Sequence, residues 1–241
     1  MEVSSESDIY RFNCNHQVYI FSSGLSENKT MKPSSKAKVR ELYEDCADAY
    51  SGIMDSEIGQ PIYSDTLGRL AERIAEIPGP VIDTSCGSGH MLSRYHERYD
   101  PRRSLIGIDL SPRMVAMTSA KLGSNAETLI ADMRVLRGVE SCSSAAVISF
   151  FAIHHIDPKE ILKALQEWHR VLRPGGQLLV AAWEGTGPID YGEESDLVAL
   201  RYTKDEVVAC VHKAGFVVSR CVVEPVAEMA MDAIYLEGSK K

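Results

Sequence analysis

The sequence predicts an α/β fold: a doubly wound, mostly parallel sheet with helices on both faces. From about residue 80 onward, short apolar stretches alternate with segments whose apolar residues recur at helical spacing. Strands that alternate with helices form parallel sheets, because each helix carries the chain back across one face. The last two expected strands, 216–223 and 233–236, are joined by a short connection, which indicates an antiparallel hairpin at one edge.

The strands and helices of this alternation follow one another in a regular order. Expected strands are 81–83, 104–109, 128–131, 145–153 and 177–183, and expected helices are 92–98, 112–122, 157–172 and a last one beginning at 204. Ser111 suits an N-cap, with Pro112 at the first helical position. Thr203 and Glu206 form a capping box, and the helix that they open should end before Gly215.

The segment that precedes the alternation divides into an extension and two helices. Residues 1–35 are rich in Ser, Asn and Lys and lack periodicity, so we expect an N-terminal extension there and the functional domain over 36–241. Helical spacing predicts helices over 37–49 and 62–77, the second ended by Pro-Gly-Pro at 78–80. In a sheet of this kind the ligand binds at the carboxyl ends of the strands, and we expect segments 37–60 and 185–202 to act as lids over that site.

Composition and charge exclude several classes of protein. The chain has 241 residues, of which 44% are apolar, and its 26 Lys and Arg against 34 Asp and Glu give a formal net charge of −8. Its longest apolar stretch, 145–153, is shorter than the roughly 18 residues of a membrane span, and its acidic start is unlike an export signal. We therefore expect a cytoplasmic protein with neither a membrane nor a nucleic acid as partner.

Cysteine spacing gives no sign of a structural metal. The six cysteines include no C-x-x-C pair, and zinc sites of that kind need ligands at short spacing. We therefore expect no metal site.

The loop after the first strand of the alternation is the first candidate for a ligand site. Residues 83–90 read Asp-Thr-Ser-Cys-Gly-Ser-Gly-His, and small residues before a helix let the backbone approach a ligand closely. A dinucleotide fingerprint would need a third glycine, where this chain has Leu92. The loop thus favours a nucleotide-like ligand other than NAD or FAD, and an ordinary tight turn is the alternative.

Carboxylates at two later strand ends extend this site. Asp109 lies 20 residues after Gly89 at the end of the second strand, a spacing that suits hydrogen bonds to ribose hydroxyls. Asp132 follows the third strand beside Met133, an acceptor and an apolar surface that suit an adenine. A helix cap or a solvated carboxylate is the alternative for either aspartate.

Together these segments resemble the class I S-adenosylmethionine-dependent methyltransferases over about residues 39–240. The resemblance is carried by VIDTSCGSG at 81–89, IGIDLS at 106–111, IADM at 130–133, FAIHHI at 151–156 and VLRPGGQLLV at 171–180. It implies a Rossmann-like methyltransferase fold with a seven-stranded sheet, an antiparallel last strand and S-adenosyl-L-methionine as cofactor. Ser85 departs from the family, which usually has glycine there.

The resemblance also implies which residues bind the cofactor. Asp83 would organise the glycine loop and face the cofactor ammonium, Asp109 would hold the ribose, and Asp132 with Met133 would hold the adenine. Tyr50 would reach the cofactor carboxylate. The full implied set is Tyr50, Asp83, Ser85, Cys86, Gly87, Gly89, Asp109, Leu110, Met114, Asp132, Met133, Ser149 and Phe150.

Candidates for the acceptor side lie farther along the chain. His154 and His155 follow the fourth strand, and one of them could take a proton near neutral pH. The alternative is that one histidine packs inward and the other caps the next helix. Further candidates for the acceptor pocket are Tyr43, His154, Trp183 and Glu184.

We expect an enzyme that methylates a small molecule at O, N or C by direct displacement, as a monomer or homodimer. Alignment of acceptor, methyl and sulfur supplies much of such a reaction, and a base is needed only where the acceptor must lose a proton. The alternatives are a protein or RNA acceptor, or a cofactor-binding partner subunit without its own activity.

Overall fold

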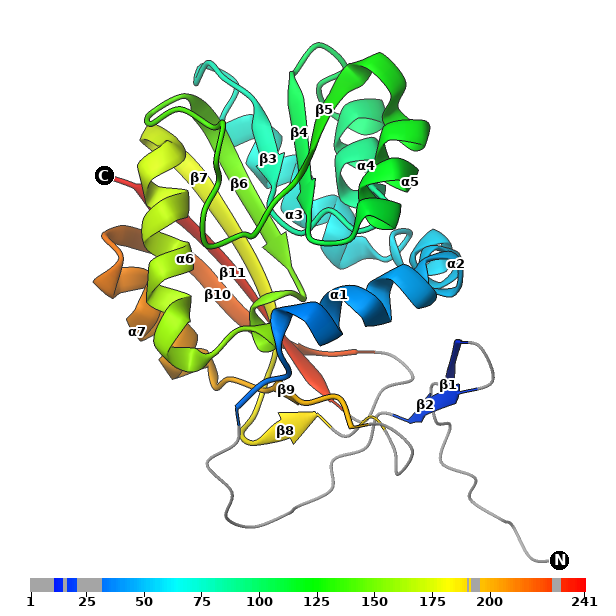
Figure 1. Ribbon diagram of the computed structural model, residues 1–241. Helices are drawn as coiled ribbons and strands as arrows, with labels where there is room; N and C mark the ends of the chain where they lie inside the picture. The colour runs from blue at the N-terminus through cyan, green and yellow to red at the C-terminus, as the bar shows by residue number, and fades with distance from the viewer. Residues whose placement is uncertain (1–10, 15–16, 21–31, 190, 192–195, 227–230) are drawn as a thin grey trace, which may run out of the picture.

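One large sheet with helices on both faces forms the body of the protein, as a computed structural model shows (Figure 1). The structure describes residues 11–14, 17–20, 32–189, 191, 196–226 and 231–241. A separate antiparallel pair near the N-terminus consists of β1 (Arg11–Cys14) and β2 (Gln17–Ile20).

The sheet has seven strands in the order β10-β11-β7-β6-β3-β4-β5, which confirms the expected fold class. Its strands are β3 (Val81–Asp83), β4 (Leu105–Asp109), β5 (Ala126–Ile130), β6 (Ser144–Phe150), β7 (Leu172–Trp183), β10 (Phe216–Pro225) and β11 (Asp232–Lys240). The five strands from β3 to β7 pair in parallel. The last strand, β11, is antiparallel to both of its neighbours and lies between β7 and β10. The expected hairpin therefore forms one edge of the sheet, with β10 outermost.

Alternate residues of the central strands face two separate apolar layers. Val147 of β6 packs in the cluster that holds helices α6 and α7, whereas its neighbours Ala146 and Ile148 pack in the cluster that holds α3 and α4. The helices around the sheet are α3 (Pro61–Arg73), α4 (His90–Arg98), α5 (Pro112–Leu122), α6 (Pro158–Val171) and α7 (Lys204–Lys213). Apolar residues on both faces explain why these strands read as continuous apolar runs.

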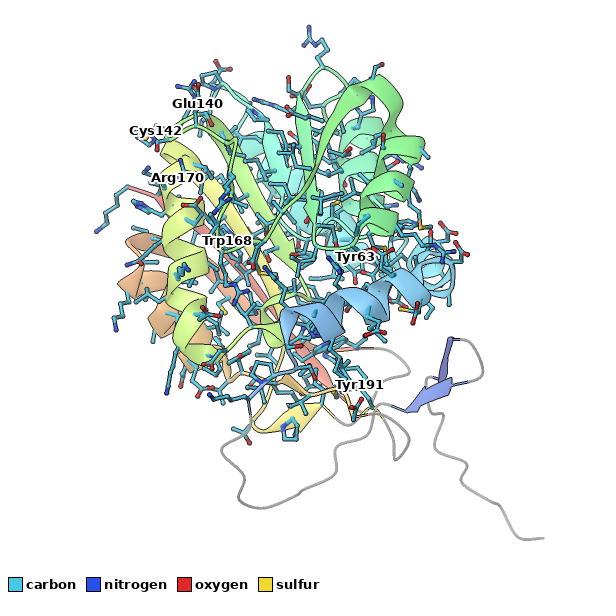
Figure 2. The ribbon with its side chains drawn as sticks, in the orientation of Figure 1. Tyr63, Glu140, Cys142, Trp168, Arg170 and Tyr191 are labelled. Atoms are coloured by element: carbon cyan, nitrogen blue, oxygen red, sulfur yellow. The ribbon has the colours of Figure 1, made fainter. Side chains whose placement is uncertain are left out.

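Trp168 anchors α6 to the sheet (Figure 2). Its side chain is fully buried, and its indole Nε1–H donates to the carbonyl oxygen of Met133 at 2.9 Å. Because its ring is buried and its N–H is hydrogen-bonded, Trp168 holds α6 against the sheet and against the loop that follows β5.

Two helices precede the sheet where the sequence predicted one over 37–49. The prediction is wrong at Cys46, which separates α1 (Lys36–Asp45) from α2 (Ala47–Glu57). Figure 1 shows α1 lying across the carboxyl ends of the central strands. The Ser35 side chain accepts a hydrogen bond from the backbone of Lys38 and so caps this helix.

The segment 185–202 contains a short ladder that the sequence did not predict. It pairs β8 (Pro188–Ile189) with β9 (Ala199–Leu200), while residues 190 and 192–195 lie outside the described residues. Ser34 bonds to the backbone of Val198 through both its N–H and its hydroxyl, each at 2.8 Å. Lys38 of α1 also donates to the carbonyl of Asp196 at 2.9 Å, so the two predicted lid segments contact one another.

Other boundaries also differ from the predictions, among them the start of β7 at Leu172 rather than 177, and two of the differences have a clear cause. Helix α3 ends at Arg73 rather than 77, because the Arg103 guanidinium donates to the carbonyls of Ile74 and Ile77 and satisfies the chain after the helix. Strand β6 ends at Phe150 rather than 153, because Phe151 adopts a positive φ of 50° and turns the chain.

None of the helices in the described part of the chain is both long and apolar enough to cross a membrane.

Glu237 of β11 is a buried carboxylate that ties the inserted strand to α3. Its side chain is 2% exposed and lies 2.6 Å from Arg69 and 3.0 Å from Arg73.

Replacing Glu237 with Ala should lower the free energy of unfolding by about 2–3 kcal/mol, less than for a fully buried pair because both arginines reach solvent. Urea denaturation would measure this change. As a control, replacing the exposed strand residue Glu127 with Ala should change the free energy of unfolding by less than about 0.5 kcal/mol. Equal effects of the two changes would contradict the prediction.

Candidate functional site

A cavity of about 280 Å³ lies at the carboxyl ends of the parallel strands, and residues of α1 line one side of it. Its walls come from α1, from the segment 32–35 and from the loops that follow β3, β4, β5 and β6. Ligands of open α/β sheets bind at this edge, where adjacent loops diverge. The cavity is therefore the candidate site, and five separated parts of the sequence build it.

The glycine loop after β3 (residues 84–89) depends on two residues with positive φ. Gly87 has φ +50° and Gly89, at the N-terminus of α4, has φ +84°. A Cβ on Gly89 would lie 3.0 Å from the Thr118 hydroxyl, and that hydroxyl donates to the carbonyl of Gly87 at 2.7 Å. Only glycine lets the loop approach α5 this closely, and the loop in turn leaves its outer side open to the cavity.

Asp109 fixes the other side of this loop. One carboxylate oxygen accepts from the Gly87 N–H and the other from the Ser111 N–H, both at 3.0 Å. Burial raises the pKa of Asp109, although the backbone donors at Ser111, Gly87 and Leu110 oppose the shift. Each carboxylate oxygen can accept a second hydrogen bond, so Asp109 can still receive hydroxyl groups from the cavity.

Asp83 is more deeply enclosed, at the end of β3. Among the described residues, its side chain accepts a hydrogen bond from the Ser85 N–H alone, at 3.2 Å. Burial raises the pKa of Asp83 from 3.8 to about 7, and the nearby charge of Asp109 adds to the shift. A buried carboxylate with so few donors is a site that a cationic group would stabilise.

Asp132 lines the cavity after β5 but already has strong partners. Arg134 donates to it from the backbone and from the guanidinium, at 3.0, 2.8 and 2.6 Å, and Lys36 of α1 lies 3.5 Å away. Burial alone would raise the pKa of Asp132, but Arg134 and then Lys36 lower it. This carboxylate is thus a fixed negative group in the wall.

The two adjacent histidines lie on a short 3-10 turn, Ile153–His155, rather than on the end of a strand. His155 lines the cavity, and its Nε2 lies 3.0 Å from the Tyr43 hydroxyl of α1. His154 is 3% exposed and packs against His155 with ring centroids 4.0 Å apart. Burial lowers the pKa of His155 to about 3 and that of His154 well below its ordinary value, so both rings are neutral near pH 7.

Most of the predicted site residues meet at this cavity. Those that line it are Tyr43, Tyr50, Ser85, Gly87, Asp109, Leu110, Asp132, Met133, Phe150 and His155. Asp83 and Cys86 line a small adjoining cavity of about 30 Å³, which shares Tyr50, Ser85 and Phe150 with the main one. The predicted residues that support the walls without lining either cavity are Gly89, Met114, Ser149, His154, Trp183 and Glu184.

Two of these wall residues have other contacts. Trp183 stacks on Phe151 with ring centroids 4.5 Å apart, and Phe151 itself lines the cavity. Glu184 accepts from the backbone N–H of Lys204 at 2.8 Å, so it serves the first turn of α7.

Sequence reasoning missed the part of the wall that comes from the start of α1. It placed residues 32–35 in the extension, yet they line the cavity together with Lys36, Val39 and Arg40. The pair Ser34-Ser35 before a run of helix formers is an N-cap signal that could have revealed the boundary. The missed lining residues beyond α1 include Thr84, Ser111, Arg134 and Phe151.

The residues present fit a ligand that combines a nucleoside with an amino acid. Asp109 offers free acceptor capacity for hydroxyls, and Asp83 offers a buried carboxyl for an ammonium group. Within the described part of the chain the buried Ser85 hydroxyl has no hydrogen-bond partner, which leaves it available to a ligand.

Comparison with known proteins agrees with this geometry. Residues 81–176 match the model of a family described as a methyltransferase domain. The tRNA (carboxymethyluridine(34)-5-O)-methyltransferase of Arabidopsis thaliana is 28% identical over 165 residues, which are 67% of this chain and 36% of that protein. The ubiquinone/menaquinone biosynthesis C-methyltransferase of Syntrophotalea carbinolica is 33% identical over 121 residues, 46% of this chain and 47% of that protein. The match thus spans less than half the length of each of these relatives.

A solved structure extends the likeness to almost the whole chain. The 1,6-didemethyltoxoflavin-N1-methyltransferase of Burkholderia thailandensis, crystallised with S-adenosylhomocysteine, has a TM-score of 0.65 at 15% identity and covers 97% of this chain and 99% of its own. At that identity the likeness shows a shared fold. The family match over 81–176 identifies that part of the chain as a methyltransferase domain, and the chain has the fold of S-adenosylmethionine-dependent methyltransferases.

Proposed function

We propose that this protein transfers a methyl group from S-adenosylmethionine to a small-molecule acceptor. The observation that carries the proposal is the position of the glycine loop and Asp109 on two sides of one cavity that α1 covers. The family match supports the cofactor, and the enclosure by α1 supports an acceptor of limited size.

Residues that line the two adjoining cavities would hold the cofactor. When bound, the cofactor supplies a methyl group on a positively charged sulfur. Asp109 would accept the ribose hydroxyls with the acceptor capacity that its backbone donors leave free. Asp83 would ionise beside the cofactor ammonium, which offsets the cost of burying its charge. Leu110 and Met133 would supply apolar contact to the adenine, because both line the cavity beside the acidic groups.

His155 is better suited to orienting the acceptor than to accepting a proton from it. A group whose pKa is about 3 is a weak base at neutral pH, and its Nε2 is already engaged by the Tyr43 hydroxyl. The pair joins α1 to the turn after β6 across the cavity. We infer that Tyr43 and His155 fix the acceptor by hydrogen bonding and that alignment supplies most of the rate.

An RNA acceptor is the second candidate. The Arabidopsis relative is a tRNA methyltransferase, and Lys32, Lys36 and Arg40 are exposed at the edge of the cavity, where they could meet phosphates. Against it, the chain carries a net charge of −8. A small-molecule acceptor is preferred because α1 covers the cavity and so limits the size of the acceptor.

The decisive experiment offers both acceptor classes to the purified protein. Radiolabelled S-adenosylmethionine would be incubated with a protein-free small-molecule extract or with bulk tRNA, and label would be counted in each fraction. Label in the small-molecule fraction supports the proposal, and label confined to tRNA would establish the second candidate. Binding of S-adenosylhomocysteine without transfer to either fraction would favour a partner subunit without its own activity.

Asp109→Ala tests the ribose assignment. Loss of charge-assisted hydrogen bonds of about 1.5–3 kcal/mol should raise the Kd for S-adenosylhomocysteine by about 10- to 150-fold. Isothermal titration calorimetry would measure it, with the exposed α3 residue Asp65→Ala as a matched control. Unchanged affinity in Asp109→Ala would remove the assignment.

Asp83→Asn tests the buried carboxyl through the pH dependence of stability. In the unfolded chain this group loses its proton near pH 3.8, whereas the folded protein retains it up to about pH 7. The contribution of the protonated Asp83 carboxyl to stability is therefore fully present below pH 3.8 and is lost as the pH rises through about 7. The amide cannot ionise, so the variant should gain stability relative to wild type from pH 5 to pH 8 in ligand-free urea titrations. A difference that stays constant between the two pH values would show that Asp83 is not perturbed in this way.

A further inference from the structure

His90 connects three elements at the edge of the cofactor site. It is the first residue of α4 and is 6% exposed. Its Nε2 lies 2.7 Å from a carboxylate oxygen of Asp55 on α2, and its Nδ1 lies 2.9 Å from the hydroxyl of Ser88 in the glycine loop. Lys121 of α5 places its ammonium 2.9 Å from Nε2 and 3.9 Å from Asp55.

The partners of this histidine define its tautomer. The Asp55 carboxylate only accepts and the Lys121 ammonium only donates, so Nε2 of a neutral ring can hydrogen-bond to one of the two. The shorter contact, 2.7 Å to Asp55, places the proton on Nε2, and Nδ1 then accepts from the Ser88 hydroxyl. Burial lowers the pKa of His90 and the Lys121 ammonium adds to this, although the hydrogen bond to Asp55 opposes the shift. The ring is therefore a neutral bridge whose two nitrogens are both engaged, one toward α2 and one toward the glycine loop.

The same connectivity of serine, histidine and aspartate occurs in hydrolytic sites, but the surroundings exclude that role here. Ser88 is 1% exposed, and the cavity that it lines measures about 30 Å³, the volume of about one water molecule. An ester or amide substrate has no space beside the hydroxyl. The arrangement joins segments and does not form a second catalytic centre.

The bridge has a direct geometric connection to the cofactor site through α2. That helix carries Tyr50 five residues before Asp55, about 7.5 Å along its axis. A Cβ on Gly87 would lie 3.0 Å from the Tyr50 ring, so the ring rests on the glycine loop itself. Tyr50 contacts Gly87, and Asp55 contacts His90. Because these contacts lie at separate points along the axis of α2, they fix the direction of this helix relative to the loop.

We propose that His90 is a positioning residue for the cofactor, because its hydrogen bonds to Asp55 and Ser88 hold α2 on the glycine loop and keep Tyr50 in the cavity wall. The inference rests on the proposed function in taking this cavity as the cofactor site. It adds a role for α2, whose Asp55 lies outside the cavity and is 68% exposed.

Asp55→Ala is the sharpest test, since an exposed side chain can be removed without disturbing the core. The variant should raise the Kd for S-adenosylhomocysteine at least about fivefold in calorimetry. Amide hydrogen exchange of the ligand-free protein should become faster over residues 47–57 and stay unchanged in α6. Asp55→Asn keeps an oxygen that can accept from Nε2 and should restore the affinity to within about twofold of wild type.

Asp45→Ala is the matched control, because Asp45 is an exposed aspartate of the neighbouring lid helix α1. It should match wild type in affinity and exchange, and the melting temperatures of both alanine variants should agree with wild type. Wild-type affinity in Asp55→Ala would overturn the positioning role, and unchanged exchange over 47–57 would overturn the tether. If wild-type protein did not bind S-adenosylhomocysteine, the proposed function would fail, while the exchange comparison would still decide whether the tether exists.

Discussion

The close approach of the glycine loop to α5 is the constraint on which the site depends. The loop can pass Thr118 only without a side chain at Gly89, and the Thr118 hydroxyl then holds the carbonyl of Gly87. This leaves the Gly87 N–H pointing to Asp109, which joins the ends of β3 and β4. A bulkier loop would separate these strand ends, and the cavity would lose the geometry on which the proposed cofactor contacts rely.

Buried charge is concentrated where the site needs it and is neutralised elsewhere. Within the described part of the chain, Asp83 and Asp109 accept hydrogen bonds from backbone N–H groups alone, and the charge of Asp109 raises the pKa of Asp83. A cationic ligand would relieve this destabilising arrangement. Asp132, in contrast, pairs with Arg134 and Lys36, so its charge destabilises the protein little and attracts a cationic ligand only weakly. The neutral pair Tyr43 and His155 completes the wall without adding charge.

The sequence predicted the sheet, a hairpin at its edge and ten of the residues that line the cavity, because these depend on local signals. The capping box at Thr203 and the N-cap at Ser111 are confirmed by their hydrogen bonds. The break at Cys46, the turn at Phe151 and the wall from residues 32–35 were not predicted, because they follow from packing between distant segments. The partners of His90 were invisible for the same reason, since Asp55 and Lys121 lie 35 and 31 residues away in sequence.

The insertion of β11 between β7 and β10 has a consequence for the order of folding. β10 is synthesised before β11, yet it has no direct neighbour in the sheet until β11 is present. The parallel strands from β3 to β7 can pair earlier, whereas the contact of Glu237 with Arg69 joins residues 168 positions apart. Closing such long-range contacts slows folding, so we expect this edge to form last, and a nascent chain that stops short of β11 would expose the edge of β7 to association with other chains.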